Sequence, residues 1–247
     1  MKLLVRHVTS SNGGRKIGSE CDLFELQLEM DSSRKAVITH QITTILFDWD
    51  GTIVDSAQLG LTAFQKSFAV LGFPFPQHVY EKAYSPNWYT LYEAMGLPAD
   101  KWNDADNLWL KHYGEQTAAM IEVAGNAILE LQRKGYSLGI VSSGSTSRLA
   151  KEIENVGLGG VFQVVVCNEQ MTRKKPHPEG LHTALHLLDC AAACACYVGD
   201  SPEDITMGKS AGVMTVGVRS SYPTSWRVAE AEPDISIDSL ADIAEHF

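Results

Sequence analysis

Five short apolar runs recur along this chain, and four of them end abruptly in polar residues. Runs that are apolar on both faces suit the central strands of a parallel sheet. Helical patterns lie between the later runs, and this alternation predicts a doubly wound, Rossmann-like α/β sheet with right-handed crossovers. In such a sheet, ligands bind beyond the carboxyl ends of the strands. The predicted strands are residues 42–47, 137–141, 161–166, 195–198 and 214–218, and the predicted helices are 127–133, 147–156 and 178–188.

Residues 59–123 interrupt this alternation with amphipathic helical patterns and no strand signal. We therefore predict a helical domain inserted between the two parts of the sheet domain, at 42–58 and 124–247. It holds 12 of the 21 aromatic residues, which either line a substrate pocket or form the domain's own core. Ser85 before Pro86 predicts a helix start. The residues predicted to share one helical face are Leu61, Phe64, Phe68 and Leu71.

The first 41 residues form a separate N-terminal extension in this prediction. A turn signal lies between two strand-like stretches, 3–8 and 23–28, and favours a small hairpin. The extension carries no motif with recognisable chemistry.

In the sheet domain, the helix predicted over 127–133 has Ile128, Leu129 and Leu131 as its apolar side.

The chain has a formal net charge of −10 and a pI near 5.2. This charge disfavours nucleic acids and anionic membranes as partners, because both demand a basic face. The N-terminus lacks a signal-peptide core, and the longest apolar stretch, 190–199, is about half of what spans a bilayer. We therefore expect a cytoplasmic protein. Five cysteines without a CxxC pair predict small buried hydrophobic residues instead of disulfides or zinc ligands.

Two carboxylates, Asp48 and Asp50, follow the first predicted strand two positions apart, so their side chains are expected to point the same way. Adjacent carboxylates repel each other unless a cation or a shared proton relieves them, and a hard divalent cation is a natural partner. Gly51 lets the backbone approach a ligand closely. An EF-hand is excluded, because Gly51 comes two positions too early and Leu59 replaces the bidentate glutamate. A capped turn is the simpler alternative.

A second acidic cluster, residues 199–204, follows the fourth predicted strand and contains Asp200 and Asp204. Taken alone, it could be only a helix cap. Residues 208–210 resemble the end of a phosphate-binding P-loop, but Glu203 stands where that motif requires glycine. No GxGxxG run occurs, so a dinucleotide-binding site has no support.

Ser142 places a hydroxyl at the second strand end, and Lys175 lies in a basic pair before a predicted helix. A lysine pair is usually just solvated. Together with the two acidic clusters, however, these residues would form one pocket with a nucleophile, a metal site and a phosphate clamp.

This ordered set of motifs resembles the haloacid dehalogenase (HAD) superfamily of phosphohydrolases, in the branch with a helical cap after the first strand. Residues 48–52 match the first family motif, Ser142 the second, Lys175 the third and residues 199–204 the fourth. The resemblance runs from residue 42 to the end of the chain. It implies a HAD-like sheet with an inserted α-helical cap domain, similar to phosphoglycolate phosphatases and beta-phosphoglucomutases.

The resemblance implies a Mg²⁺-dependent phosphatase that hydrolyses a small phosphate monoester through an aspartyl-phosphate. Asp48 would be the nucleophile, and Asp50 the general acid and base. Mg²⁺ would be held by Asp48, the main-chain carbonyl of Asp50, and Asp200. Asp204 would steady Lys175 or the metal-binding loop. The phosphoryl oxygens would be bound by Gly51, Ser142, Ser143 and Lys175.

Alternatives remain open within this resemblance. Asp50 argues against dehalogenases and phosphonatases, which lack an aspartate two positions after the nucleophile. A beta-phosphoglucomutase-like enzyme must hold a bisphosphate, whereas the predicted cap has four lysines, no arginine and seven acids, which favours a monophosphatase. A non-catalytic phosphate-binding protein should have lost a catalytic group, and none is missing. The expected partner is a small phosphorylated metabolite such as phosphoglycolate, a sugar phosphate or a nucleotide, bound by a monomer or homodimer.

Overall fold

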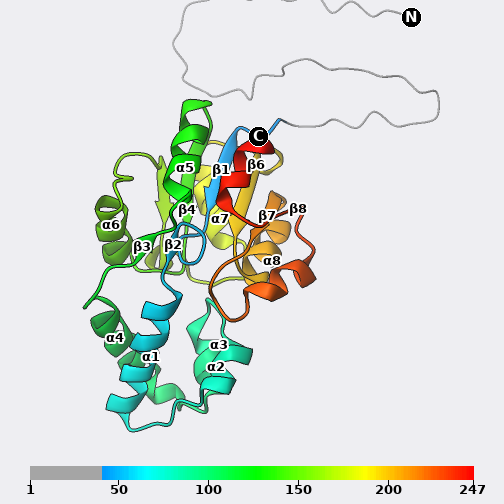
Figure 1. Cartoon of the computed structure of the whole chain (residues 1–247). Helices are drawn as coiled ribbons and strands as arrows, with labels where there is room; N and C mark the ends of the chain where they lie inside the picture. The colour runs from blue at the N-terminus through cyan, green and yellow to red at the C-terminus, as the bar shows by residue number, and fades with distance from the viewer. Residues whose placement is uncertain (1–40) are drawn as a thin grey trace, which may run out of the picture. The chain divides into compact units, whose positions relative to one another are not determined.

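The computed structural model describes residues 41–247, which form an α/β fold around a six-stranded sheet (Figure 1). All six strands are parallel, in the order β5-β4-β1-β6-β7-β8. The predicted doubly wound sheet is confirmed, and the hairpin predicted near the N-terminus lies outside the described residues. The strands are β1 (Thr44–Phe47), β4 (Ser137–Val141), β5 (Val164–Val166), β6 (Ala195–Gly199), β7 (Met214–Val218) and β8 (Ile235–Ile237).

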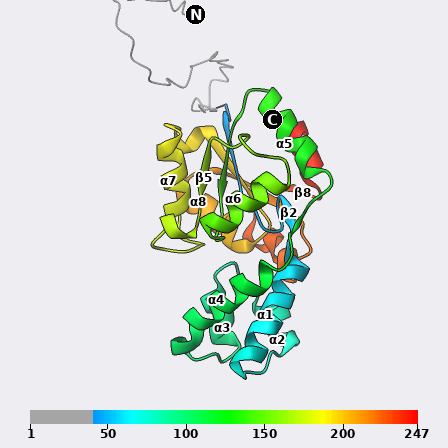
Figure 2. The same cartoon turned by 90° about the vertical axis from the view of Figure 1, so that its left-hand side faces the viewer.

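Four helices cover the two faces of the sheet: α5 (Ala124–Arg133), α6 (Thr146–Asn155), α7 (Glu179–Leu187) and α8 (Pro202–Ala211). Helix α5 lies on one side and α7 and α8 lie on the other (Figure 2). In β1, Ile45 and Phe47 join the core that contains α5 and α6, and Leu46 joins the core that contains α7 and α8. Side chains alternate across a strand, so a run that is apolar throughout becomes buried on both faces.

Asp48 and Asp200 leave neighbouring strands at the point where the strand order reverses. From β1 the chain adds β4 and β5 on one side, then crosses to β6, β7 and β8 on the other. The loops after β1 and β6 therefore diverge, and α/β sheets bind ligands in the crevice between such loops. The Asp48 amide donates a hydrogen bond to the Val198 carbonyl of β6, 2.8 Å away, which ties the two strand ends together.

Four further helices lie beyond the carboxyl ends of the strands (Figure 1): α1 (Ala57–Leu71), α2 (Gln77–Ala83), α3 (Trp88–Ala94) and α4 (Trp102–Tyr113). Phe64 and Phe68 of α1 are fully buried in a shared core, in keeping with their helical spacing. The predicted helix start at Ser85 is wrong, because α3 begins at Trp88. The Ser85 hydroxyl accepts a hydrogen bond from the Asn87 amide (3.1 Å) in the turn before that helix.

A two-stranded antiparallel ribbon connects helices α1–α4 to the sheet. It pairs β2 (Val54–Asp55) with β3 (Ala119–Met120) and so brings the departing and the returning chain side by side. The expectation of no strand within residues 59–123 is wrong at β3. A strand of two residues is too short to show a period of two.

The 3₁₀ helices are η1 (Ala99–Lys101), η2 (Asn168–Gln170), η3 (Ala192–Cys194), η4 (Ser225–Ala231) and η5 (Leu240–Glu245).

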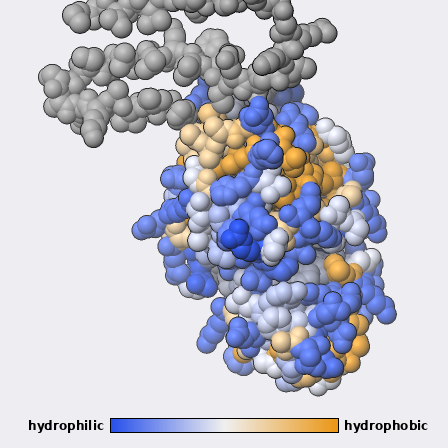
Figure 3. Space-filling model, turned by 180° about the vertical axis from the view of Figure 1, so that it is seen from behind, coloured by the Kyte–Doolittle hydropathy of each residue, from blue (hydrophilic) through white to orange (hydrophobic). Residues whose placement is uncertain are grey.

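The surface seen from behind is mostly hydrophilic, and hydrophobic residues gather on the sheet domain, toward the end away from α1–α4 (Figure 3). Within residues 41–247, no helix combines the length and the apolar character needed to cross a bilayer. Cys167, Cys194 and Cys196 are buried, which agrees with their predicted role as small hydrophobic residues, whereas Cys190 is only partly buried.

The apolar side predicted for α5 is wrong at Leu129, which is 38% exposed, whereas its neighbour Ile128 is fully buried. We expect Ile128→Ala to lower the free energy of unfolding by about 2–5 kcal/mol, because it leaves a cavity in the core. Leu129→Ala is the matched control on the same helix and should cost less than about 1 kcal/mol. Urea unfolding followed by circular dichroism measures both, and equal losses would contradict this packing of α5.

Candidate active site

Polar side chains converge in the crevice at the carboxyl edge of the sheet. Asp48 follows β1, Ser142 follows β4 and Asp200 follows β6, while Lys175 comes from the segment between η2 and α7. All four side chains are buried. Thus four residues that sequence motifs singled out, from segments far apart in the chain, lie around one crevice.

The Lys175 ammonium balances the charge of this cluster. Its Nζ lies 2.6 Å from Asp48 Oδ1, 2.7 Å from Asp204 Oδ1 and 2.8 Å from the Tyr197 hydroxyl. These contacts use its three N–H donors. Burial would lower the pKa of Lys175, but Asp204 and Asp48 outweigh it and raise the pKa, so the ammonium stays charged.

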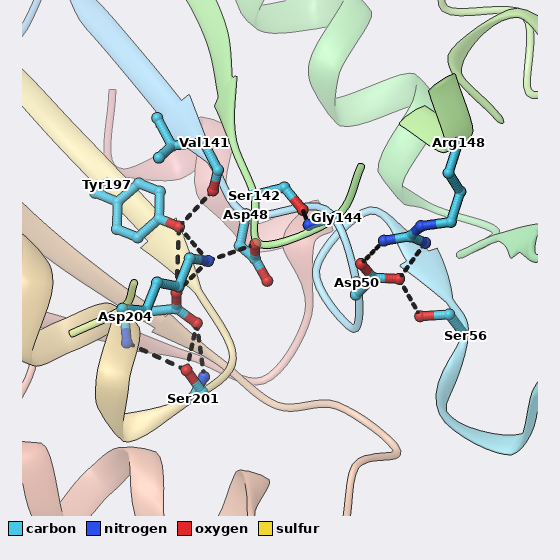
Figure 4. Close-up of polar contacts among 11 residues, drawn as sticks. Asp48, Asp50, Ser56, Val141, Ser142, Gly144, Arg148, Tyr197, Ser201 and Asp204 are labelled. Carbon is cyan, nitrogen blue, oxygen red and sulfur yellow. Dashed lines mark hydrogen bonds and ion pairs between the residues drawn. The ribbon is translucent and has the colours of Figure 1, made fainter. Parts of the chain in front are cut away.

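Asp204 uses both of its carboxylate oxygens to hold its neighbours (Figure 4). Oδ1 faces Lys175 and lies 3.1 Å from the Tyr197 hydroxyl, and Oδ2 accepts hydrogen bonds from the Ser201 amide (3.1 Å) and hydroxyl (2.6 Å). The Asp204 amide donates to the Ser201 hydroxyl (3.2 Å), which completes a capping box at the start of α8. The acidic cluster is therefore a helix cap that also orients the lysine.

Asp48, Asp200 and Asp204 bring carboxylate oxygens within 4.8 Å of one another. Because Asp204 is committed to Lys175 and Ser201, Asp48 and Asp200 are the members left to hold a cation. Burial, reinforced by Asp204 and Asp48, raises the pKa of Asp200 well above its usual range. Burial also raises the pKa of Asp48 to about 7, against the opposing charge of Lys175. A divalent cation between the two carboxylates would relieve this repulsion.

Gly51 provides the space beside Asp200. Its φ of +81° is rarely adopted by other residues, and a Cβ at this position would overlap the Asp200 carboxylate and Tyr222. The Ser220 hydroxyl donates to Asp200 Oδ2 (2.5 Å) and fixes that carboxylate. Carboxylate oxygens of this kind suit Mg²⁺, so the residues present fit the cofactor that the resemblance implies.

Asp50 is held by Arg148 of α6 and not by Lys175 (Figure 4). Arg148 Nη1 lies 2.9 Å from Asp50 Oδ1 and Nη2 lies 2.5 Å from Oδ2, and the Ser56 hydroxyl donates to Oδ1 (2.7 Å). Burial would raise the pKa of Asp50, but Arg148 outweighs it and the pKa is lowered. Asp48 and Asp50 thus bind different cations, although their spacing predicted a common direction. That spacing rule holds only within a strand, and β1 ends at Phe47.

The two serines after β4 differ in their contacts. The Ser142 hydroxyl accepts a hydrogen bond from the Gly144 amide (3.0 Å) and keeps its own proton available to a ligand. The Ser143 hydroxyl is buried and has no hydrogen-bond partner among residues 41–247. An unpaired buried hydroxyl costs free energy, so it is a candidate contact for a polar ligand.

A cavity of about 40 Å³ lies over these residues. Asp48, Ser142, Ser143 and Asp200 contribute to its lining from the sheet domain. The helical module, α1–α4 with the turns between them, contributes aromatic side chains to it, whereas Phe68 and Tyr92 pack against each other in the hydrophobic core, with ring centres 6.1 Å apart, and do not line the cavity. The sequence prediction left a pocket role and a core role open for the aromatic residues of this module, and Phe64 and Trp109 have both roles. The aromatic residues that line the cavity are Phe64, Tyr84, Trp88, Trp109 and Tyr222.

The model of the haloacid dehalogenase-like hydrolase family matches residues 45–218. The chain therefore belongs to this family of hydrolases. Pyrophosphatase PpaX of Listeria monocytogenes serotype 4b is 31% identical over 215 residues, in a match that covers 83% of this chain and 96% of the relative.

Solved structures share the fold of this chain. A predicted phosphoglycolate phosphatase from Haemophilus somnus superposes with a TM-score of 0.73 at 21% identity, over 83% of this chain and 98% of that one. A beta-phosphoglucomutase from Clostridium difficile superposes with a TM-score of 0.68 at 18% identity, over 82% and 93%. Identities this low establish a common fold and not a common substrate.

Gly51→Ala tests whether the space beside Asp200 matters for metal binding. We expect Mg²⁺ affinity, measured by isothermal titration calorimetry, to fall at least about tenfold, because the new methyl group displaces a carboxylate ligand. Gly72→Ala is the control. Gly72 has a similar φ of +77° but nothing within 4 Å of a Cβ, so it shares the backbone strain alone. Equal Mg²⁺ affinity in the two variants would contradict the assigned metal position.

Proposed function

We propose that this chain is a Mg²⁺-dependent phosphohydrolase that forms an aspartyl-phosphate on Asp48. The environment of Asp48 carries this proposal. Lys175 holds Oδ1, while the other oxygen makes no hydrogen bond within residues 41–247, and Asp48 lines the cavity (Figure 4). A carboxylate fixed by one oxygen and open at the other is placed to act as a nucleophile. Membership of a hydrolase family supports the same chemistry.

In the first step, the open oxygen of Asp48 attacks phosphorus and the bond to the leaving oxygen breaks. Lys175, Ser142, Ser143 and the backbone at Gly51 bind the phosphoryl oxygens, where charge must be stabilised in the transition state. When bound by Asp48, the Asp50 carbonyl and Asp200, Mg²⁺ would neutralise part of that charge. Water then hydrolyses the aspartyl-phosphate and releases phosphate.

Asp50 is proposed to give a proton to the leaving oxygen and then to take one from the attacking water. Both of its carboxylate oxygens are bonded to Arg148 in this structure. Asp50 must therefore release at least one of these bonds before it can face the substrate. Helices α1–α4, which contribute aromatic residues to the cavity, are proposed to act as the cap.

A small phosphate monoester similar to phosphoglycolate is the proposed substrate class. The cavity is lined largely by aromatic and hydroxyl-bearing side chains, with Arg148 as the one cation among the described lining residues, which favours a small leaving group of modest charge over a nucleotide or a bisphosphate. Pyrophosphate is the second candidate. The 31% identity to pyrophosphatase PpaX favours it.

Phosphate release from pyrophosphate, phosphoglycolate, glucose 1-phosphate and p-nitrophenyl phosphate tests this function. We expect Mg²⁺-dependent turnover that stops when the metal is chelated. Asp48→Asn should lower kcat at least about a thousandfold, because it removes the nucleophile. Asp238→Asn is the control, since its side chain is 87% exposed. If wild type and Asp48→Asn were equally inert with several divalent metals, the chain would be no enzyme of this kind.

A further inference from the structure

Arg148 is the single cationic residue among the described residues that line the cavity over Asp48. Its side chain is only 10% exposed. The remaining lining is aromatic, small, hydroxyl-bearing or acidic. Lys175 is not part of this lining. A second negative group on a substrate would therefore find Arg148 as the one cation on it. The planar guanidinium suits bidentate binding of carboxylate or phosphate.

Unused hydrogen-bonding groups lie on the same lining. Arg148 Nε and Ser143 Oγ are both buried, and neither has a hydrogen-bond partner within residues 41–247. Buried donors without partners are rare in folded proteins, because each loses its hydration without compensation. Ser143 is already assigned to the transferring phosphoryl group, so the unpaired Nε–H of Arg148 is the donor left for a second, oxygen-rich anion.

Asp50 now occupies the guanidinium as an internal anion. It accepts from Nη1 at 2.9 Å and from Nη2 at 2.5 Å, in the two-pronged arrangement that an external carboxylate or phosphate would use. The same contact keeps Asp50 from the substrate. An anion that takes Arg148 would therefore also free Asp50.

We propose that Arg148 is a specificity-determining residue that binds a second anionic group on the leaving-group side of the substrate, in exchange for Asp50. This proposal rests on the proposed function. The preferred substrates carry a carboxylate or phosphate close to the leaving oxygen, as phosphoglycolate and pyrophosphate do. A phosphate ester without that group leaves Asp50 bound to Arg148 and reacts slowly.

Arg148 has other contacts that keep it in place after the exchange. Nη1 lies 3.1 Å from Glu152 Oε2 and 3.3 Å from the Tyr113 hydroxyl, and the guanidinium lies 5.0 Å from the centre of the Tyr113 ring. Glu152 is itself fixed by the Trp49 indole N–H at 2.7 Å. Tyr113 ends helix α4 and stacks on Trp109, a cavity residue, with ring centres 4.6 Å apart. The guanidinium is therefore supported from both the sheet domain and the helical module.

The test compares phosphoglycolate with ethyl phosphate, which has a methyl group in place of the carboxylate, in the full chain with Mg²⁺. The quantity measured is the ratio of kcat/KM for the two substrates. Wild type should favour phosphoglycolate, and Arg148→Met should lower this ratio at least about 30-fold, since a buried charge contact to the substrate is lost. Lys151→Met, an exposed cation one turn along α6, should keep the wild-type ratio.

An equal loss of kcat/KM toward both substrates in Arg148→Met would overturn the proposal, because Arg148 would then act only through the fold or through Asp50.

The same proposal can be tested on the wild-type protein without any variant. Inhibition constants of 3-phosphonopropionate and propylphosphonate, which differ by the carboxylate alone, should differ at least about 30-fold. Equal inhibition constants would likewise overturn it.

Failure of the two proposals can be told apart. Wild type that releases no phosphate from any ester or from pyrophosphate refutes the function itself, and the role of Arg148 with it. Wild type that turns over both substrates with no preference for phosphoglycolate refutes only the role of Arg148.

Discussion

One buried ammonium, that of Lys175, makes the rest of this site possible. Asp48, Asp200 and Asp204 place carboxylate oxygens within 4.8 Å of one another away from bulk water, which is costly without a nearby cation. Lys175 contacts two of the three and is itself anchored by Tyr197. One lysine faces three carboxyl groups, so a divalent cation can bind where the lysine does not reach.

Each of the two aspartates of the first motif is held by its own cation. Lys175 comes from the segment before α7 and Arg148 from α6, on the opposite face of the sheet. This separation gives two neighbours in sequence different chemical environments: the pKa of Asp48 is raised and that of Asp50 is lowered. The proposed nucleophile and the proposed acid–base group are thereby distinguished by their surroundings and not by residue type.

The sequence predicts the sheet and the strand-end residues well, because apolar runs and the polar residues that end them are local features. Asp48, Ser142 and Asp200 were found in this way. Arg148 and Tyr197 were missed, because an arginine on a helix and a tyrosine in a strand acquire their roles only through tertiary contacts. Strand β8 and the ribbon β2–β3 were missed for a different reason, since two or three residues cannot show a period.

The ribbon β2–β3 has a consequence for how such proteins diversify. Val54 is paired with Met120, so the chain returns to the sheet beside the point where it left. The segment between these two strands leaves the sheet and returns to the same place, and it adds no strand to the six-stranded sheet. Its length and side chains can change, or the whole segment can be exchanged with that of a relative, while Asp48, Ser142 and Asp200 at the strand ends keep their positions. The part of the cavity lining that comes from α1–α4 can then change without moving the residues at the strand ends.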